Sequence, residues 1–263
     1  MKTDGTSALY LPPDYPIRNE HADRAVRFIN GLTHTKGRHA KKGFDLRPWQ
    51  ENKIIRPIFG RVDENGMRII RKSFIGLPRK NGKSEICAAI ALKMLCSDGE
   101  HGGQIYSAAS DRDQAALVFN VAKGMVLNDP KLSQRCKIID SQKRIVYLPT
   151  DSFYRAISSD ANTKHGFDTS GVVYDELHTA RDRELWDVLT TSTGSREQPL
   201  IVAITTAGYD KETICGEQWE YAWDVQRGLV IDPGFHPVIF SAPDDADWQD
   251  REIWHAVNPA LGD

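Results

Sequence analysis

Short apolar runs alternate with amphipathic stretches along most of the chain, and this alternation gives the first expectation about its fold. Between residues 67 and 240 the runs are brief and nearly continuous in apolar residues, which is typical of strands buried on both faces. We therefore predict an α/β fold with a mostly parallel central sheet flanked by helices. Strands are expected near residues 69–76, 103–109, 144–149, 171–175, 200–206 and 236–241, and helices near 82–97, 111–127, 183–192 and 212–227.

The two ends of the chain follow a different pattern. Residues 1–20 are rich in proline and polar groups, which disfavours a helix, and a short helix is expected over 21–33. Pro48 suits the first turn of another helix, which runs through Ile55. We divide the chain into an N-terminal arm with a short helix (1–43), a core (44–242) and a C-terminal segment (243–263) with a helix near 247–257.

Composition and charge narrow the class of protein. The chain is 40% hydrophobic and 27% charged, which is an ordinary globular balance. Its formal net charge of −2 gives no overall positive field, so any contact with nucleic acid is expected to be local. The most basic stretch, residues 36–43, is interpreted as a solvated loop, with a contact to phosphates as the alternative.

The cysteines and the apolar runs suggest a compartment. The four cysteines have no spacing typical of a zinc site or a disulfide framework, which favours a reducing compartment. No apolar run approaches the roughly 18 residues of a membrane-spanning helix. We expect a cytosolic protein that does not contact a membrane.

Residues 77–84, Leu-Pro-Arg-Lys-Asn-Gly-Lys-Ser, connect an expected strand to a strong helix former. In this context a loop ending in Gly-Lys-Ser is typical of a phosphate loop, because its backbone N–H groups and the helix N-terminus face the phosphates. Lys83 is expected to reach the β- and γ-phosphate oxygens and Ser84 to bind magnesium. The loop departs from the usual pattern, since Leu77 stands where a glycine is expected. The alternative is a Gly-Lys-Ser that only begins a helix.

Other residues of this loop and of an earlier segment complete the expected ATP site. Arg79 and Lys80 add positive charge, and either side chain is long enough for the γ-phosphate, although both also suit a solvated loop. Trp49 and Gln50 precede the first core strand and are candidates to frame adenine, with a core tryptophan beside a surface amide as the alternative. The expected nucleotide-binding residues are Trp49, Gln50, Pro78, Arg79, Lys80, Asn81, Gly82, Lys83, Ser84 and Glu85.

Two further strand ends carry polar residues. An apolar strand ends at Asp175 and Glu176, and buried carboxylates need partners. Asp175 is predicted to bind magnesium, and Glu176 to orient and deprotonate the attacking water. Thr205 and Thr206 end another strand and are predicted to sense the γ-phosphate or the water, although threonine also favours strands for its shape alone.

Taken in order, the aromatic-Gln pair, residues 77–84, Ser107-Ala-Ala-Ser-Asp-Arg-Asp-Gln-Ala115, residues 172–176 and residues 205–208 resemble the large terminase subunit of tailed bacteriophages. The resemblance covers most of residues 44–260. It implies a P-loop NTPase core of the additional-strand, catalytic-glutamate type that binds ATP and Mg²⁺. The function it implies is ATP hydrolysis that powers the translocation of double-stranded viral DNA into a procapsid.

By position, the resemblance assigns functional parts to this chain. Lys83 and Ser84 form the Walker A pair, with Arg79 as the loop arginine, and Gln50 contacts adenine. Asp175 and Glu176 form Walker B, and Thr205 and Thr206 form the coupling motif.

The resemblance also implies partners. They are double-stranded DNA, the portal protein and the small terminase subunit, in the host cytoplasm and transiently at the procapsid portal. A homo-oligomeric ring is expected on the portal and a monomer in isolation. In the family a nuclease domain follows the ATPase domain. About twenty residues after the last strand leave no room for it, so we expect 243–263 to be the start of a lid or linker and no nuclease activity from this chain.

A neighbouring subunit of such a ring is expected to supply a cation to the γ-phosphate. Lys164 is the first candidate, followed by Arg181 and Arg183, and an exposed charge is the alternative for each. Two other functions remain open. One is a DExH-type helicase fragment, since residues 175–178 read Asp-Glu-Leu-His, and the other is an ATP-binding docking module that does not hydrolyse ATP.

Overall fold

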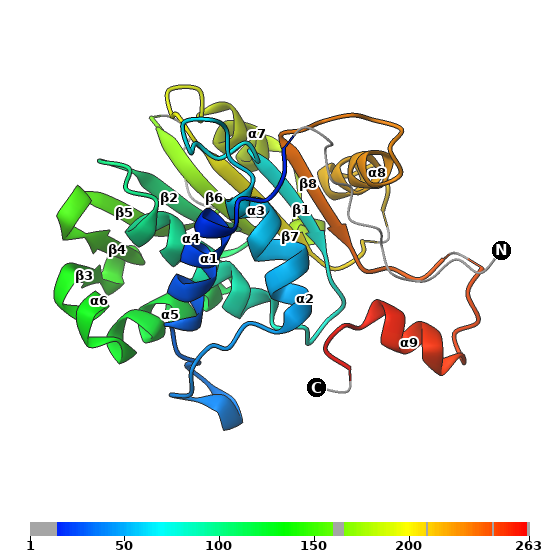
Figure 1. The fold of residues 1–263 in the computed structure, drawn as a ribbon, viewed down its shortest axis with the longest axis horizontal. Helices are drawn as coiled ribbons and strands as arrows, with labels where there is room; N and C mark the ends of the chain where they lie inside the picture. The colour runs from blue at the N-terminus through cyan, green and yellow to red at the C-terminus, as the bar shows by residue number, and fades with distance from the viewer. Residues whose placement is uncertain (1–14, 160–165, 209, 244, 262–263) are drawn as a thin grey trace.

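An eight-stranded sheet forms the centre of the computed structural model, which describes residues 15–159, 166–208, 210–243 and 245–261 (Figure 1). The strand order is β3-β4-β5-β2-β6-β7-β1-β8. The six strands from β5 to β8 in this order run parallel to one another. Strand β4 pairs antiparallel with β5 on one side and with β3 on the other. The strands are β1 Lys72–Gly76, β2 Gln104–Ala109, β3 Cys136–Ile139, β4 Arg144–Tyr147, β5 Ser152–Ser158, β6 Thr169–Asp175, β7 Leu200–Thr205 and β8 Phe235–Ile239.

Helices cover both faces of the sheet. On one face, α1, α4 and α5 contribute to a large apolar cluster, and on the other, α7 and α8 contribute to a second one. The ends of these helices agree with the sequence expectation to within a few residues. The helices are α1 Asn19–Asn30, α2 Pro48–Gln50, α3 Arg56–Gly60, α4 Lys83–Ser97, α5 Arg112–Asn128, α6 Pro130–Arg135, α7 Glu184–Thr191, α8 Ile214–Gln226 and α9 Arg251–Val257.

Strand β7 lies between β1 and β6, in register with both. This places an extra strand between the one that leads into the phosphate loop and the one that ends in the two carboxylates. The prediction of a mostly parallel sheet of the additional-strand type is confirmed. Because parallel strands share one carboxyl edge, the phosphate loop, the carboxylates and the threonine pair meet at the same edge of the sheet.

The strand prediction was incomplete in one region. Residues 144–149 were expected as one strand, and the structure has β4 there as the middle strand of an antiparallel group. The flanking strands β3 and β5 were not predicted. Strand β5 mixes exposed and buried positions without strict alternation, since Arg155 is exposed between the buried Tyr154 and the half-buried Ala156, so its pattern did not indicate a strand.

The helix expected from Pro48 is longer than predicted and irregular. A π-helical turn, Glu51–Ile55, joins α2 to α3 and carries the helix to Gly60. Among the described residues, no helix combines the length and apolar character needed to cross a bilayer.

Candidate nucleotide-binding site

The phosphate loop spans the short connection between β1 and α4. Gly82 is the N-cap of α4 and has a φ of 73°, a left-handed conformation that favours glycine. Asn81 Nδ2 donates to the carbonyl oxygens of Pro78 and Arg79, both at 3.2 Å. Lys83 Nζ donates to the Pro78 carbonyl at 3.4 Å. The loop is therefore held in shape by its own side chains.

Leu77 explains why the loop departs from the usual glycine pattern. Its backbone N–H donates to the Thr205 carbonyl at 2.9 Å, which continues the β1–β7 ladder by one residue, and its side chain is buried. Glycine is required one position earlier, at Gly76, because a Cβ there would lie 2.8 Å from the Trp219 ring. The free loop thus begins only after Leu77.

The acidic end of β6 faces the start of α4. Ser84 Oγ donates to Asp175 Oδ2 at 3.3 Å. Asp175 is 3% exposed and its Oδ1 has no hydrogen-bond partner. Burial, with a further contribution from the nearby Glu176 charge, raises the pKa of Asp175 to about 6.

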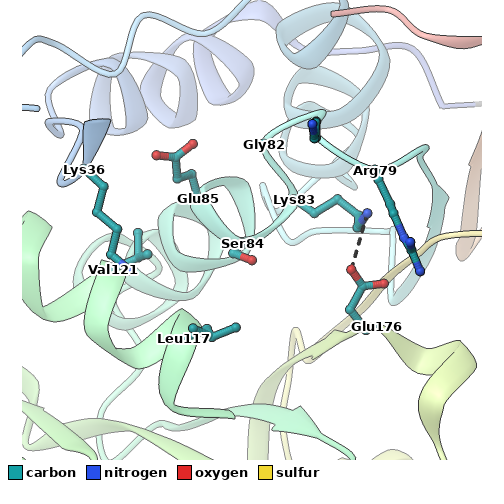
Figure 2. Close-up of a pocket in the computed structure, with 10 residues that line it drawn as sticks. Lys36, Arg79, Gly82, Lys83, Ser84, Glu85, Leu117, Val121 and Glu176 are labelled. Carbon is teal, nitrogen blue, oxygen red and sulfur yellow. Dashed lines mark ion pairs between the residues drawn. The ribbon is translucent and has the colours of Figure 1, made fainter. Parts of the chain in front are cut away.

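Glu176 follows the strand in an unusual backbone conformation, with φ of 55° and ψ of 52°. Its N–H donates to the Ile204 carbonyl at 2.8 Å, and Thr179 Oγ1 donates to its carbonyl oxygen at 2.8 Å. Its carboxylate Oε1 lies 3.4 Å from Lys83 Nζ. Figure 2 shows these two side chains pointing toward one another, with Arg79 beside them.

The threonine pair is reached through a residue that the sequence analysis did not single out. Thr205 and Thr206 both contact the ring of His178, at 3.1 Å for Thr205 Oγ1 and 3.3 Å for Thr206 Oγ1. The same ring lies 3.3 Å from Glu176 Oε2. The structure therefore connects the two strand ends through His178. Its position two residues after Glu176 was the only sequence signal, in the Asp-Glu-Leu-His reading.

A cavity of about 400 Å³ opens over the loop and the carboxylate. Besides loop residues and Glu176, it is lined by Leu117 and Val121 of α5 and by Lys36. Figure 2 shows Lys36 entering from the N-terminal segment, on the side away from Glu176. The basic stretch 36–43 was interpreted as solvated, and Lys36 is indeed exposed, but its side chain also lines the cavity, which is in keeping with the alternative of a contact with phosphate. Its contact depends on tertiary structure, which the local sequence does not show.

Gln50 and Trp49 point to different places. Gln50 lines a second cavity of about 510 Å³ that shares Lys36, Lys80, Gly82 and Glu85 with the first. Its Oε1 accepts from Arg47 N at 3.0 Å, and its Nε2 would lie 3.8 Å from a Cβ on Gly82. Trp49 instead packs edge-on against Phe240, with ring centroids 5.6 Å apart. Of the pair, Gln50 is the one that lies beside the phosphate loop.

The segment after α9 returns to the phosphate loop, where Ala260 N donates to Asn81 Oδ1 at 3.1 Å.

The candidates for a cation supplied to a neighbouring subunit are less well defined. Lys164 lies outside the described residues. Arg183 pairs with Asp187 at 2.9 Å and with Glu217 at 3.1 Å, and Arg181 also has a partner. Neither arginine therefore projects as an isolated charge.

The oxygens at the β6 end fit a magnesium ion. Asp175 Oδ1 is a buried acceptor without a donor, and Ser84 Oγ lies next to the same carboxylate. Magnesium takes oxygen ligands and is commonly held by one or two protein groups together with waters and phosphate oxygens. Among the described residues there is no group of three or more His, Cys, Asp or Glu side chains placed to hold a metal ion. A site with few protein ligands is therefore the type that the structure offers.

Comparisons with known proteins identify the family of this chain. Residues 48–224 match the family described as Terminase large subunit, ATPase domain. The chain is 34% identical over 193 residues to the large terminase subunit of Enterobacteria phage HK97, an alignment that covers 72% of this chain and 37% of that protein.

Solved structures give the same result. The crystal structure of the HK97 bacteriophage large terminase superposes with a TM-score of 0.79 and 31% identity, covering 92% of this chain and 48% of that one. The ATPase domain of the Thermus phage P74-26 large terminase, at 17% identity and a TM-score of 0.52, supports the fold alone; it covers 64% of this chain and 74% of that one. The chain thus spans less than half the length of the HK97 protein. It belongs to the family of terminase large subunit ATPase domains.

Proposed function

We propose that this chain hydrolyses ATP and that it is the ATPase domain of a motor that moves double-stranded viral DNA into a procapsid. The observation that carries the proposal is the contact of Lys83 and Ser84, at the start of α4, with Glu176 and Asp175, at the end of β6. These are the residue types that phosphoryl transfer requires, at one edge of a sheet where ligands of such folds bind.

Some residues of the site would bind the phosphates of ATP, and others would act on the attacking water. The N–H groups at the start of α4 and the Lys83 ammonium would bind the β- and γ-phosphates, and Arg79 adds charge on the same side. Glu176 would accept a proton from the water whose oxygen attacks the γ-phosphorus as the bond to the β–γ bridging oxygen breaks. Ser84 and Asp175 would hold magnesium, which neutralises phosphate charge when bound. Thr205 and Thr206 would sense the loss of phosphate.

The second cavity is the proposed site for the adenosine part of ATP. It continues from the phosphate loop, and the Gln50 amide at its wall offers a donor and an acceptor suited to the adenine edge. The packing of Trp49 on Phe240 supports a structural role for that ring.

Magnesium-dependent release of phosphate from ATP by the purified chain is the direct test of the enzymatic part. Turnover is expected to fall to background in excess EDTA and to return when magnesium is added. A chain that binds ATP but releases no phosphate in any assembly would instead support the docking module. The family match does not favour that module or the DExH helicase.

The proposal extends to partners that the relatives' function suggests. We propose the portal protein, the small terminase subunit and double-stranded DNA as partners, and a ring of this chain on the portal. Turnover measured at increasing protein concentration, with and without portal, tests whether assembly activates the enzyme. We propose further that this chain does not itself cut DNA, and metal-dependent cleavage by clean protein would contradict that part alone.

A further inference from the structure

His178 touches two parts of the site that have separate proposed roles. Its ring Nδ1 lies 3.3 Å from Glu176 Oε2 and 3.1 Å from Thr205 Oγ1. Its backbone N–H also donates to Thr205 Oγ1 at 3.1 Å. The second threonine, Thr206, places its Oγ1 at 3.3 Å from Nδ1 and 3.5 Å from Nε2. One imidazole thus links the proposed general base to the end of β7.

The partners of the ring determine which nitrogen carries the proton. Thr205 Oγ1 has one proton and donates it to the Thr206 carbonyl at 2.9 Å, so toward the His178 ring it accepts. A Glu176 carboxylate also only accepts. With these two acceptors beside Nδ1 we assign the ring proton to Nδ1, and the Thr206 hydroxyl, which can donate or accept, is compatible with this assignment. Burial lowers the pKa of His178 and outweighs the opposite effect of Glu176, which favours the neutral ring.

The two oxygens of Glu176 are in different situations. Oε1 lies near the Lys83 ammonium, whereas Oε2 is buried and accepts no hydrogen bond, although His178 Nδ1 lies only 3.3 Å from it. A buried acceptor without a donor is unfavourable. A small rotation of either side chain would form the missing bond.

We propose that His178 is a positioning residue, which holds Glu176 through Oε2 when Lys83 contacts phosphate, and which links this step to the threonine pair. The inference rests on the proposed function of Glu176 as the base. With Lys83 on the phosphates, Oε1 is free to accept the proton of water, and the Nδ1 proton of His178 is the donor that remains beside Oε2. Since the same proton also faces Thr205, a shift toward Glu176 loosens the contact with β7.

Kinetics of substituted chains test the positioning role. His178→Ala is expected to lower kcat for ATP about 10- to 100-fold, short of the loss of a general base, which is about 10² to 10⁴-fold. The Kd and KM for ATP should change less than about threefold, because His178 lines neither cavity. His178→Asn, whose amide can occupy the Nδ1 position, should recover much of kcat. His255→Asn, an exposed histidine on α9, is the matched control and should behave as the parent.

Double substitutions test whether the effect passes through the named partners. In a Glu176→Gln background, His178→Ala should change the residual turnover little, since its target is gone. The effects of His178→Ala and Thr206→Val on turnover should be less than additive in the double variant, because each substitution removes the same contact between His178 and Thr206. Full additivity in both pairs would overturn the inference.

A measurement of the ring itself keeps the test valid if His178→Ala folds poorly. NMR of ¹⁵N-labelled imidazoles should show the Nδ1–H tautomer for His178, and its Nδ1 signal should shift when a non-hydrolysable ATP analogue and magnesium are added. An Nε2–H tautomer, or parental kcat in the Ala variant, would overturn the inference and leave the proposed ATPase intact. A parent chain that neither binds nor hydrolyses ATP in any assembly would instead contradict the proposed function.

Discussion

Lys83 Nζ lies 3.4 Å from Glu176 Oε1, with 6% of the lysine side chain and 25% of the glutamate side chain exposed. The proposed chemistry requires both groups elsewhere, with the ammonium on phosphate oxygens and the carboxylate on water. Binding of ATP is therefore expected to exchange one ionic partner of Lys83 for another. Breaking the contact between Lys83 and Glu176 costs free energy, which lowers the affinity for ATP. Substitution of one residue at a time can separate this effect on binding from the effect on catalysis.

Substitution of each member of this pair should give a different defect. Lys83→Ala should abolish tight ATP binding, because the phosphates lose their principal cation. Glu176→Gln should lose turnover, since an amide does not accept the proton, and should bind ATP at least as tightly as the parent because Lys83 no longer has an anionic partner. Calorimetry and phosphate release measure the two effects, with the exposed Glu212→Gln as the control. Parental turnover in Glu176→Gln would remove Glu176 from its proposed role.

Asp175 is expected to lower stability at neutral pH. Its pKa is about 6 in the fold and 3.8 in the reference state, so the folded chain binds the proton more tightly and this group's contribution to stability falls as pH rises from about 4 to about 6. About two pKa units correspond to at most about 3 kcal/mol. Asp175→Asn should therefore raise Tm at pH 7.5, abolish magnesium-dependent turnover, and lose its Tm advantage as pH falls toward 4. Thermal unfolding across that range checks the sign, and a lower Tm for the variant at pH 7.5 would contradict it.

Gln50 should determine part of the preference for ATP over GTP. Its Oε1 already accepts from Arg47 N, and a carbonyl oxygen has a second lone pair for the adenine amino group. Gln50→Ala should reduce the difference in binding free energy between ATP and GTP by about 1–3 kcal/mol, the scale of one bidentate base contact. Competition binding with both nucleotides measures the ratio. An unchanged ratio would leave Gln50 as a capping residue of its own helix.

Lys36 should strengthen nucleotide binding from the opposite wall of the cavity. Lys36→Ala is expected to weaken ATP affinity about three- to tenfold, as for one charge-assisted contact that stays partly solvated. The loss should diminish at high salt, because screening already weakens the contact in the parent. Lys131→Ala, an exposed lysine of α6, is the control. If the Lys36 variant and the parent bind ATP with equal affinity at low salt, Lys36 does not contact the nucleotide and belongs to a solvated loop.

Lys164 remains the first candidate for a cation supplied by a neighbouring subunit. A mixture of Glu176→Gln protein, which keeps the donor, with Lys164→Ala protein, which keeps the active site, should recover part of the turnover that each lacks alone in portal-bound assemblies. A trans cation raises turnover by about 10³ to 10⁵ in related phosphoryl transfer. Parental turnover of Lys164→Ala in such assemblies would move the role to Arg181 or Arg183, which would first have to leave their present partners.

The parts of the site that follow buried strands could be predicted from the sequence, because each of these strand ends is a local pattern. Lys83, Asp175 and Thr205 all lie where the pattern placed them, at one carboxyl edge. Residues that arrive from a distance could not be found in this way. Lys36 reaches the cavity only because α1 and the loop after it pack beside α4.

The missed strands have a similar physical reason. Both missed strands, β3 and β5, pair antiparallel with β4, and the register sets the partner of each residue, from Cys136 with Tyr147 to Ile139 with Arg144 in β3. Such cross-strand pairs are not encoded in the local alternation of either strand. The ordered set of motifs indicated the family without that edge of the sheet, since none of the quoted motifs lies in it.

The left-handed backbone of Glu176 bears on how the sequence of this site can change over evolution. A residue with a Cβ is held there at a cost of roughly 1–2 kcal/mol, and glycine would adopt the conformation freely. Glu176→Gly is therefore expected to raise the stability of the fold and, if Glu176 is the base as proposed, to abolish turnover. Selection for stability alone should therefore favour replacement of Glu176. Laboratory evolution for thermostability without an activity screen is expected to replace this residue early.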